Sequence, residues 1–227
     1  MGFVKRRFNN YRRTNLLAEY LFDGNANDTS GNGHDGTVSG ATLATDRFGN
    51  FNATYDFSND KITSPNSTDF NFGTSPFSIS CWVNTDVLLG IQTILIFGEC
   101  KSPSNANQVL IYILSTGEIR LYIVGTTPAQ YNTFNTGYFV NISTWYHIVM
   151  LRTATGSELY VNGVSVYSAS YPATNPNLIF TCINSIGAYY KNAVHSNFFN
   201  GKIDDVRIFD RVLTPYEIKT LTYKKTA

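Results

Sequence analysis

The sequence carries little charge and has no long apolar stretch. Charged residues make up 15% of the 227 residues, against about a quarter in ordinary soluble proteins. No stretch approaches the ~20 consecutive apolar residues of a membrane-spanning helix, so the sequence predicts no membrane span. Aromatic residues nevertheless reach 15%. That content argues against disorder over most of the chain, because disordered segments combine high charge with few aromatic residues.

Cysteine is also scarce. The three cysteines, Cys81, Cys100 and Cys182, are an odd number and lie far apart, so they do not predict a disulfide scaffold. The basic start is not followed by the apolar core of a secretory signal, because asparagines and arginines interrupt it. We therefore expect reduced thiols in a chain that folds in a cytoplasm.

Positive charge is concentrated at the start of the chain. Residues 1–13 contain five basic residues and no acidic one, whereas the remaining 12 basic and 16 acidic residues give the rest a net charge of −4. That balance argues against nucleic-acid binding by the rest of the chain. We expect residues 1–15 to form an arm that binds a protein partner or a capsid, ahead of one domain over residues 16–227. The basic residues of the arm are Lys5, Arg6, Arg7, Arg12 and Arg13.

The rest of the chain has the alternating pattern of short β-strands. In residues 77–83 every second residue is apolar, which places Cys81 on the buried face. Asn162-Gly163 between alternating apolar residues predicts a hairpin with a type I′ turn. Thr214 and Glu217 have the spacing of a helix capping box. These patterns predict an all-β, two-sheet sandwich with one short C-terminal helix.

Three parts of the sequence together resemble the laminin-G-like (concanavalin A-like lectin/glucanase) jelly-roll family, over about residues 16–222. The resemblance implies a jelly roll of two antiparallel sheets, often with one structural calcium ion. It also implies a lectin-like or adhesive module. The segments that carry it are residues 18–36, residues 77–83 with 145–149 and 159–163, and residues 199–214.

An acidic group is the candidate metal site. Ile203 has one strand parity and Val206 and Ile208 the other, so the sequence predicts a bulge between them. A bulge of this kind re-aims carboxylates, and calcium takes 6–8 oxygen ligands. The resemblance implies calcium ligands in the loop over residues 23–36 and at the bulge. The candidate ligands are Asp23, Asp28, Asp204 and Asp205.

Purely structural roles are the alternative for these acids. In that interpretation Asp28 caps backbone amides of its own loop. Asp205 then forms an ion pair with Arg207 or Arg211.

Catalysis has little support in the sequence. Retaining glycosidases need two carboxylates ~5–5.5 Å apart, and the closely spaced acids that such jelly-roll enzymes carry on one strand are missing. Asp204 and Asp205 are adjacent but would face opposite ways in a regular strand. His147, between apolar and aromatic neighbours, is expected to be a structural strand residue. The sequence therefore predicts a protein that is not an enzyme.

Tyrosines are the candidate ligand-binding residues. Sugar sites combine exposed rings with a few polar groups that fix hydroxyls, and Tyr131, Tyr189 and Tyr190 lie in polar stretches. The alternative is that these tyrosines fill the core and the strand edges. Trp82 and Trp145 match core positions of the family and are not chosen.

These observations leave three functions open. The first is a non-catalytic module of a virion, such as a phage decoration, fibre or spike protein, attached through its arm and located in the virion or the host cytoplasm during assembly. The second is an extracellular, glycan-binding adhesin module. The third is a glycoside hydrolase-like enzyme. Association between copies of the chain is compatible with the first two.

Overall fold

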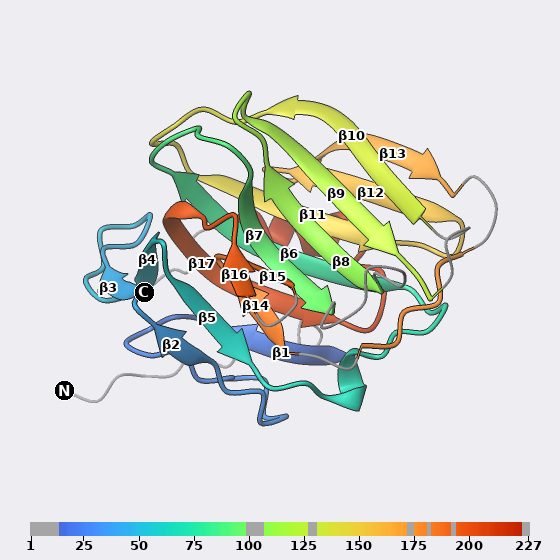
Figure 1. Ribbon diagram of the computed structural model, residues 1–227, viewed down its shortest axis with the longest axis horizontal. Helices are drawn as coiled ribbons and strands as arrows, with labels where there is room; N and C mark the ends of the chain where they lie inside the picture. Colours follow the sequence, from blue (N-terminus) through green and yellow to red (C-terminus); the bar gives the residue numbers. More distant parts are fainter. Residues whose placement is uncertain are drawn as a thin grey trace.

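The chain folds into two β-sheets packed face to face, as the computed structural model in Figure 1 shows. The structure describes residues 14–98, 107–126, 131–171, 175–180, 183–191 and 194–223. Figure 1 views the molecule from the side of the second sheet, so that the first sheet lies behind it. All strand pairs within the described residues are antiparallel, and the predicted jelly-roll sandwich is confirmed.

The first sheet, called sheet A, has eight strands in the described chain. These are β1 (Leu16–Tyr20), β3 (Thr42–Ala44), β4 (Thr54–Ser58), β6 (Phe77–Thr85), β11 (Tyr146–Arg152), β12 (Gly156–Val161), β13 (Val164–Ser170) and β17 (Asn200–Phe209). Their order is β13-β12-β11-β6-β17-β4-β3, with β1 paired to β17 beside β4.

The second sheet, called sheet B, has seven strands in the described chain. These are β2 (Thr37–Ser39), β5 (Lys61–Ser64), β7 (Gln92–Gly98), β8 (Gln108–Ile113), β9 (Glu118–Val124), β10 (Tyr131–Phe139) and β14 (Asn184–Ile186). Their order is β10-β9-β8-β7-β14-β5-β2. A small hairpin of β15 (Tyr189–Lys191) and β16 (Val194–Ser196) lies next to β7.

The core lies between the two sheets, because each strand alternates inward apolar residues with outward ones. Cys81 faces this core, as predicted, and its burial raises the pKa of the thiol to about 12. Met150 also belongs to this core. A nonpolar interior of this kind holds the sheets together mainly by removing apolar surface from water.

Two local predictions about chain reversal and helix start are confirmed. Asn162 (φ 50°) and Gly163 (φ 80°) join β12 to β13 as a two-residue hairpin, with the positive φ that a type I′ turn requires. Helix α1 (Pro215–Thr222) begins with the predicted capping box: the Thr214 hydroxyl accepts from the Glu217 amide, and the Glu217 carboxylate accepts from the Thr214 amide. The described part of the chain contains no helix long and apolar enough to cross a membrane.

Helix α1 covers part of the outer face of sheet A. Ile218 of the helix is buried with Val149 and Leu151 of β11 and with Phe209 of β17. This second, smaller apolar cluster is separate from the core between the sheets. The outer face of sheet A is therefore not a free surface at this place.

Strand β17 changes its neighbour halfway along its length. Its first half, up to Ile203, pairs with β4, and its second half, from Val206, pairs with β1. Along its other edge β17 pairs with β6, with a register shift between Asp204 and Arg207. Asp205 has φ 50°, so the predicted bulge is confirmed.

Candidate functional site

A cluster of charged side chains is buried on the outer face of sheet A. We call it the charged cluster. It contains three acids and two arginines, and each side chain is 6% exposed or less. Its members are Glu19 of β1, Arg47 of the loop between β3 and β4, and Asp204, Asp205 and Arg207 of β17.

The bulge in β17 brings two neighbouring carboxylates to one guanidinium. In a regular strand Asp204 and Asp205 would point to opposite faces, but both form hydrogen-bonded ion pairs with Arg47. Nη1 of Arg47 donates to Asp204 Oδ2, and Nη2 donates to Asp205 Oδ2. The planar fork of a guanidinium suits such a double contact.

Arg207 extends the charged cluster toward β1. Its Nε donates to Glu19 Oε1 at 3.0 Å, and its Nη2 donates to Asp205 Oδ1 at 3.2 Å. Burial alone would lower the pKa of Arg207, but the charges of Asp205 and Glu19 outweigh it and raise that pKa. The guanidinium therefore stays charged inside the protein.

Aromatic rings enclose Arg47. The guanidinium carbon lies 4.4 Å from the ring centre of Phe48 and 4.5 Å from that of Trp82. Trp82 was expected in the core from the resemblance, but it is half-buried and belongs to the outer side of sheet A, opposite Asp204. The ring faces stabilise the cation where little water reaches it.

His147 lies next to this group in β11 and is fully buried. Its Nε2 is 2.8 Å from the Ser80 hydroxyl, and its ring packs on Trp82. Burial, together with the positive charge of Arg207, lowers its pKa to about 3. A histidine that is neutral at ordinary pH has the structural role predicted for it.

The four predicted calcium ligands do not assemble into a cation site in the described chain. Asp28 Oδ1 accepts from the amides of Glu19 and Ser30, and its Oδ2 accepts from the amide of His34, which is the alternative role expected for it. Despite its burial, these bonds lower the pKa of Asp28. Asp23 is exposed. No group of three or more His, Cys, Asp or Glu among the described residues can hold a metal ion.

Calcium does not fit the charged cluster as it is arranged. Asp204 and Asp205 face a guanidinium, and Asp205 also pairs with Arg207, as the alternative interpretation expected. A divalent cation would have to displace Arg47 to reach both carboxylates. Calcium binding at these residues stays a prediction.

The outer face of sheet B has a different character. Inward residues of β8 and β9 belong to the core, so the residues between them point outward. In register, the outward residues of β7 to β10 form two rows across the strands. These are Thr93, Tyr112, Arg120 and Asn135, and then Ile96, Leu110, Tyr122 and Thr133. We call these eight residues the tyrosine face.

Two tyrosines are central to this face. Tyr112 and Tyr122 are half-buried and are diagonal neighbours on β8 and β9, a relation that corresponds to roughly 7–8 Å between positions. Thr133 and Asn135 on the edge strand β10 are exposed. The face therefore combines rings with exposed hydroxyl and amide groups.

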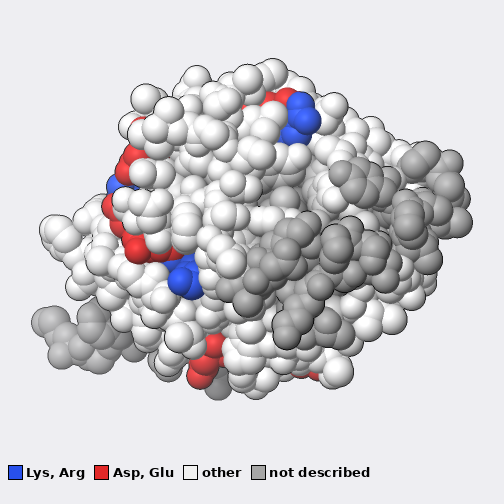
Figure 2. Space-filling view, in the orientation of Figure 1, with Lys and Arg blue, Asp and Glu red and all other residues white. Residues whose placement is uncertain are grey.

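Charge on the tyrosine face is paired. Arg120 donates from Nε and Nη2 to Glu118 Oε2 at 3.1 and 3.0 Å. The other carboxylate oxygen of Glu118 accepts from the amide of Gly137 at 3.1 Å. Figure 2, which views this side of the molecule, shows few charged side chains on the described surface.

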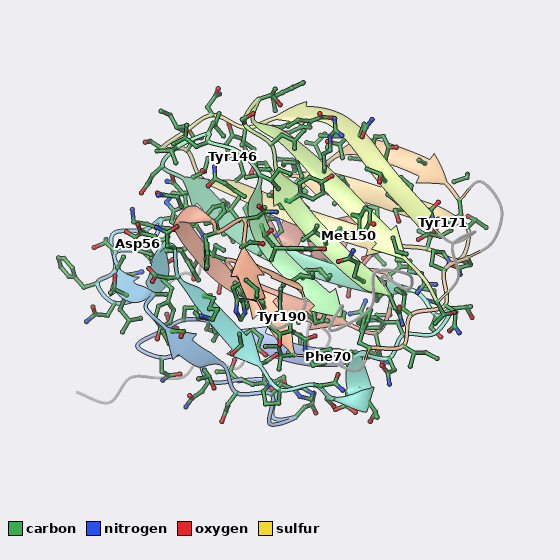
Figure 3. The ribbon with its side chains drawn as sticks, in the orientation of Figure 1. Asp56, Phe70, Tyr146, Met150, Tyr171 and Tyr190 are labelled. Carbon is green, nitrogen blue, oxygen red and sulfur yellow. The ribbon has the colours of Figure 1, made fainter. Side chains whose placement is uncertain are left out.

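The three predicted ligand-binding tyrosines do not form one group. Tyr189 and Tyr190 are half-buried on the β15–β16 hairpin, and the Tyr190 ring lies 4.7 Å from that of His195. Tyr190 lies over the middle of sheet B in Figure 3. Tyr131 starts β10, three strands from β7, which corresponds to roughly 14 Å. The side chain of Tyr131 is outside the described part of the structure.

Sequence reasoning missed Tyr112 and Tyr122, which lie between these positions. The signal was present in the alternation of residues 108–113 and 118–124, where each tyrosine has the parity opposite to the isoleucines. The five basic residues of the arm, Lys5, Arg6, Arg7, Arg12 and Arg13, lie outside the described residues. Thr14 and Asn15, at the end of the expected arm, are attached to the domain through Arg211 and Asp210.

An apolar hollow of about 510 Å³ lies at one end of the sandwich, between the β6–β7 and β10–β11 connections. Val87, Leu88, Leu89 and Ile142 line it, with Asp86 and Asn141. Ligand sites in proteins fix their ligands with several converging polar groups. The hollow has few, so we regard the tyrosine face as the better candidate site.

Comparisons with known proteins agree with the fold. The family model of the concanavalin A-like lectin/glucanases superfamily matches residues 56–219. No curated protein sequence matches the chain. Domain 4 of AbnA, a GH43 extracellular arabinanase from Geobacillus stearothermophilus solved with arabinotriose, superposes with a TM-score of 0.70 at 21% identity, covering 92% of this chain and 98% of that domain.

Toxin binding domains have similar structures. The binding domain of Paraclostridial Mosquitocidal Protein 1 has a TM-score of 0.72 at 19% identity and 93% coverage of this chain. The receptor-binding domain of botulinum neurotoxin C/D mosaic serotype has a TM-score of 0.70 at 17% identity and 92% coverage of this chain. The chain spans about half of these domains, 52% and 51% of their length, and at such identities the likeness shows the fold alone. The family model, by contrast, covers well over half of this chain, which therefore belongs to the concanavalin A-like lectin/glucanases superfamily.

Proposed function

We propose that this chain is a non-catalytic binding module that binds neutral oligosaccharides on its tyrosine face. The observation that carries the proposal is the diagonal placement of Tyr112 and Tyr122 on adjacent strands, beside the exposed Thr133 and Asn135. Rings of this kind offer apolar surface to the flat side of a sugar. Amides and hydroxyls offer hydrogen bonds to its edge.

The charge of the face favours a neutral ligand. Arg120 is paired with Glu118, so its charge is already compensated on the face. An acidic sugar would compete with that carboxylate for the guanidinium and would be repelled by it. A neutral sugar avoids both this competition and this repulsion.

Related structures support binding of carbohydrate by this fold. The arabinanase domain was solved with arabinotriose. A botulinum neurotoxin DC binding domain was solved with SialylT, and cell entry of the type C neurotoxin depends on interaction with two ganglioside molecules. These statements concern the relatives, and their extension to this chain is part of the proposal.

Buried acids support the non-catalytic part of the proposal. Asp204 and Asp205 are adjacent in sequence, but they are buried and bound to Arg47. Hydrolysis of a glycosidic bond needs two carboxylates that a sugar can reach. Turnover of a polysaccharide that is lost in Asp205→Asn would contradict this part.

The binding proposal is tested by calorimetric titration with neutral oligosaccharides, arabinotriose first. We expect Tyr122→Ala and Tyr112→Ala each to weaken binding by about tenfold, which corresponds to ~1.4 kcal/mol. Tyr122→Phe, which keeps the ring, should bind nearly as well as the wild type. Tyr216→Ala is the matched control, because Tyr216 is an exposed tyrosine of α1, the helix on sheet A.

The outcome that would overturn the proposal is equally specific. Equal affinities for the wild type, Tyr112→Ala and Tyr122→Ala would move the binding site away from the tyrosine face. Failure of a broad panel of neutral oligosaccharides to bind the folded wild type would remove the carbohydrate from the proposal. In the first case the β15–β16 hairpin, with Tyr189 and Tyr190, is the next surface to vary.

We also propose that the basic arm attaches this module to a larger particle, such as a virion. The proposal rests on the charge distribution of the sequence: residues 1–13 contain five basic residues, whereas the rest of the chain has a net charge of −4. Arginines bind carboxylates with a planar fork, and several exposed pairs must act together because each contributes only ~0.2–1 kcal/mol. Deleting residues 1–13 should leave the melting temperature nearly unchanged and abolish assembly. A truncated chain that assembles normally would end this proposal.

A further inference from the structure

We infer that Arg47 is a built-in counter-cation that holds the charged cluster together, so that the fold needs no metal ion there, and that removing its guanidinium creates a divalent-cation site. The inference concerns the outer face of sheet A and is independent of the proposed glycan site.

The position of the charged cluster explains why a cation is needed. Asp204 and Asp205 lie where the pairing of β17 with β4 ends and its pairing with β1 begins. On this edge of β17 the bulge therefore interrupts the hydrogen-bonded ladder. Asp205 holds a positive φ of 50° there, which costs energy for a residue with a side chain. Two adjacent carboxylates directed to one side also repel each other. A positive charge between them removes the repulsion and fixes the bulge.

Arg47 is delivered by a loop that is itself held in place. The carboxylate of Asp46 accepts from the amides of Phe48 and Asn50 at 2.8 and 2.9 Å, and from the Asn50 side chain at 2.9 Å. The Asp46 amide donates to the Asn50 carbonyl at 3.0 Å. This closed turn presents Arg47 to the carboxylates with its backbone already ordered.

The guanidinium performs the function that a bound metal would perform. It joins both carboxylates of the bulge to the β3–β4 loop, and it is enclosed by Phe48 and Trp82. A guanidinium has one positive charge and five fixed donors, whereas calcium needs 6–8 oxygen ligands. While Arg47 is present, calcium has no access to the two carboxylates together.

Loss of Arg47 changes this balance. The cluster then contains three carboxylates and only one of its two guanidiniums, and the space of the lost side chain lies beside Asp204 and Asp205. Two neighbouring carboxylate groups, together with nearby backbone oxygens, are ligands that favour a hard divalent cation. The variant should therefore gain a dependence on calcium that the wild type lacks.

The experiment uses the full chain, freed of metal with a chelator, and calcium alone as the probe. Thermal scans of the wild type should be the same with chelator and with millimolar calcium. Arg47→Ala should melt roughly 10 °C lower in chelator, and calcium should raise its melting temperature by mass action. Arg47→Lys keeps the charge without the fork, so it should melt between the two and respond little to calcium.

A second measurement does not depend on stability. Trp82 packs on the guanidinium of Arg47, so terbium bound in place of that group would lie close enough to be sensitised by the indole. We expect terbium luminescence in Arg47→Gln, with displacement by calcium, and none in the wild type. In the double variant Arg47→Gln with Asp204→Asn the luminescence should be lost. If Arg47→Ala does not fold in chelator, recovery of its fold on addition of calcium supports the inference.

Four results would overturn the inference. A wild type that is stabilised by calcium, with the effect lost in Asp204→Asn, would show that calcium displaces Arg47. Unchanged melting of Arg47→Ala would show that the guanidinium does not hold the cluster. No calcium response in Arg47→Ala together with no terbium luminescence in Arg47→Gln would show that the carboxylates form no latent cation site. The same conclusion would follow if Arg47→Ala stayed unfolded in calcium.

Discussion

The two outer faces of the sandwich use polar residues in opposite ways. On sheet A, charged residues are buried and joined to one another, as in the contacts of Arg47 with Asp204 and Asp205. On sheet B, Tyr112 and Tyr122 are half-buried beside one ion pair, that of Arg120 with Glu118, and the edge strand exposes Thr133. Removing charge from water is expensive, so it is tolerated only where each group has partners. Uncharged rings and amides can remain half-exposed at little cost.

The polar groups on the two outer faces of this fold therefore have different surroundings. The outer face of sheet A is covered by α1 and by loops, and its polar groups are used to fix strand β17 and the neighbouring chain. The outer face of sheet B exposes uncharged polar side chains, Thr133 and Asn135, on its edge strand. If the first face is structural and the second recognises a ligand, substitutions on sheet A should change stability and substitutions on sheet B should change ligand affinity.

The largest effect is expected on the charged cluster. Arg207→Ala leaves Glu19 and Asp205 buried without the guanidinium that pairs with both, and should lower the free energy of unfolding by about 3–5 kcal/mol in urea titrations. Lys202→Ala on the same strand is the control. Its pair with Asp56, at 3.8 Å, is partly exposed and should be worth less than ~1 kcal/mol. Equal losses in the two variants would mean that burial does not distinguish these pairs.

The next effect is a pH dependence from His147. The unfolded chain binds a proton on this histidine near pH 6.5, whereas the folded chain binds it only near pH 3, because burial lowers the pKa. Stability is therefore fully present above about pH 6.5 and falls toward pH 3, by about 1.4 kcal/mol per pH unit within this window. Urea titrations from pH 7 to pH 4 should show a shallower decline for His147→Gln than for the wild type. Parallel declines would contradict the buried neutral state.

Local patterns predicted much of the structure. Period-two alternation indicated β6 and the core position of Cys81, and the Asn162-Gly163 turn and the Thr214 capping box lie where expected. The parity change around Asp204 predicted the bulge in β17. Each of these features depends on residues close together in the chain, so a short window of sequence contains the cause.

Long-range partners could not be predicted in this way. Arg47 contacts Asp204 across 157 residues, and nothing in residues 46–50 indicates a buried ion pair. Strand β10 looked like a polar stretch, yet it pairs along β9 and buries Asn132 and Thr136. Its structure is determined by the edge that β9 offers and not by its own hydrophobicity.

The paired charge on the tyrosine face gives the next prediction, which rests on the proposed glycan site. Glu118→Gln keeps an acceptor for the Gly137 amide but frees Arg120 from its carboxylate. Affinity for a carboxylated oligosaccharide should rise by about tenfold, or ~1.4 kcal/mol, since a hydrogen bond to a charged group becomes available. Neutral oligosaccharides should bind as before. Adding Arg120→Gln should remove the gain, and a gain that persists in that double variant would show that Arg120 does not select for charge.

The smallest effect is expected where α1 covers sheet A. The Thr214 hydroxyl accepts from the Glu217 amide and donates to the Glu217 carboxylate, which also pairs with Arg211. Thr214→Ala removes the cap and should lower the free energy of unfolding by about 1 kcal/mol. The helix would remain packed through Ile218, so the loss is far smaller than at Arg207.

Thr220→Ala is the matched control for the cap, because it changes the same residue type in the same helix. The Thr220 hydroxyl only donates to the carbonyl of Tyr216, and alanine favours the helix more than threonine does. Its free energy of unfolding should therefore match or slightly exceed that of the wild type. Glycan titrations of Thr214→Ala should equal those of the wild type, since the cap lies on sheet A. A loss of glycan affinity in Thr214→Ala would mean that the two outer faces are coupled. The outer face of sheet A would then not be purely structural.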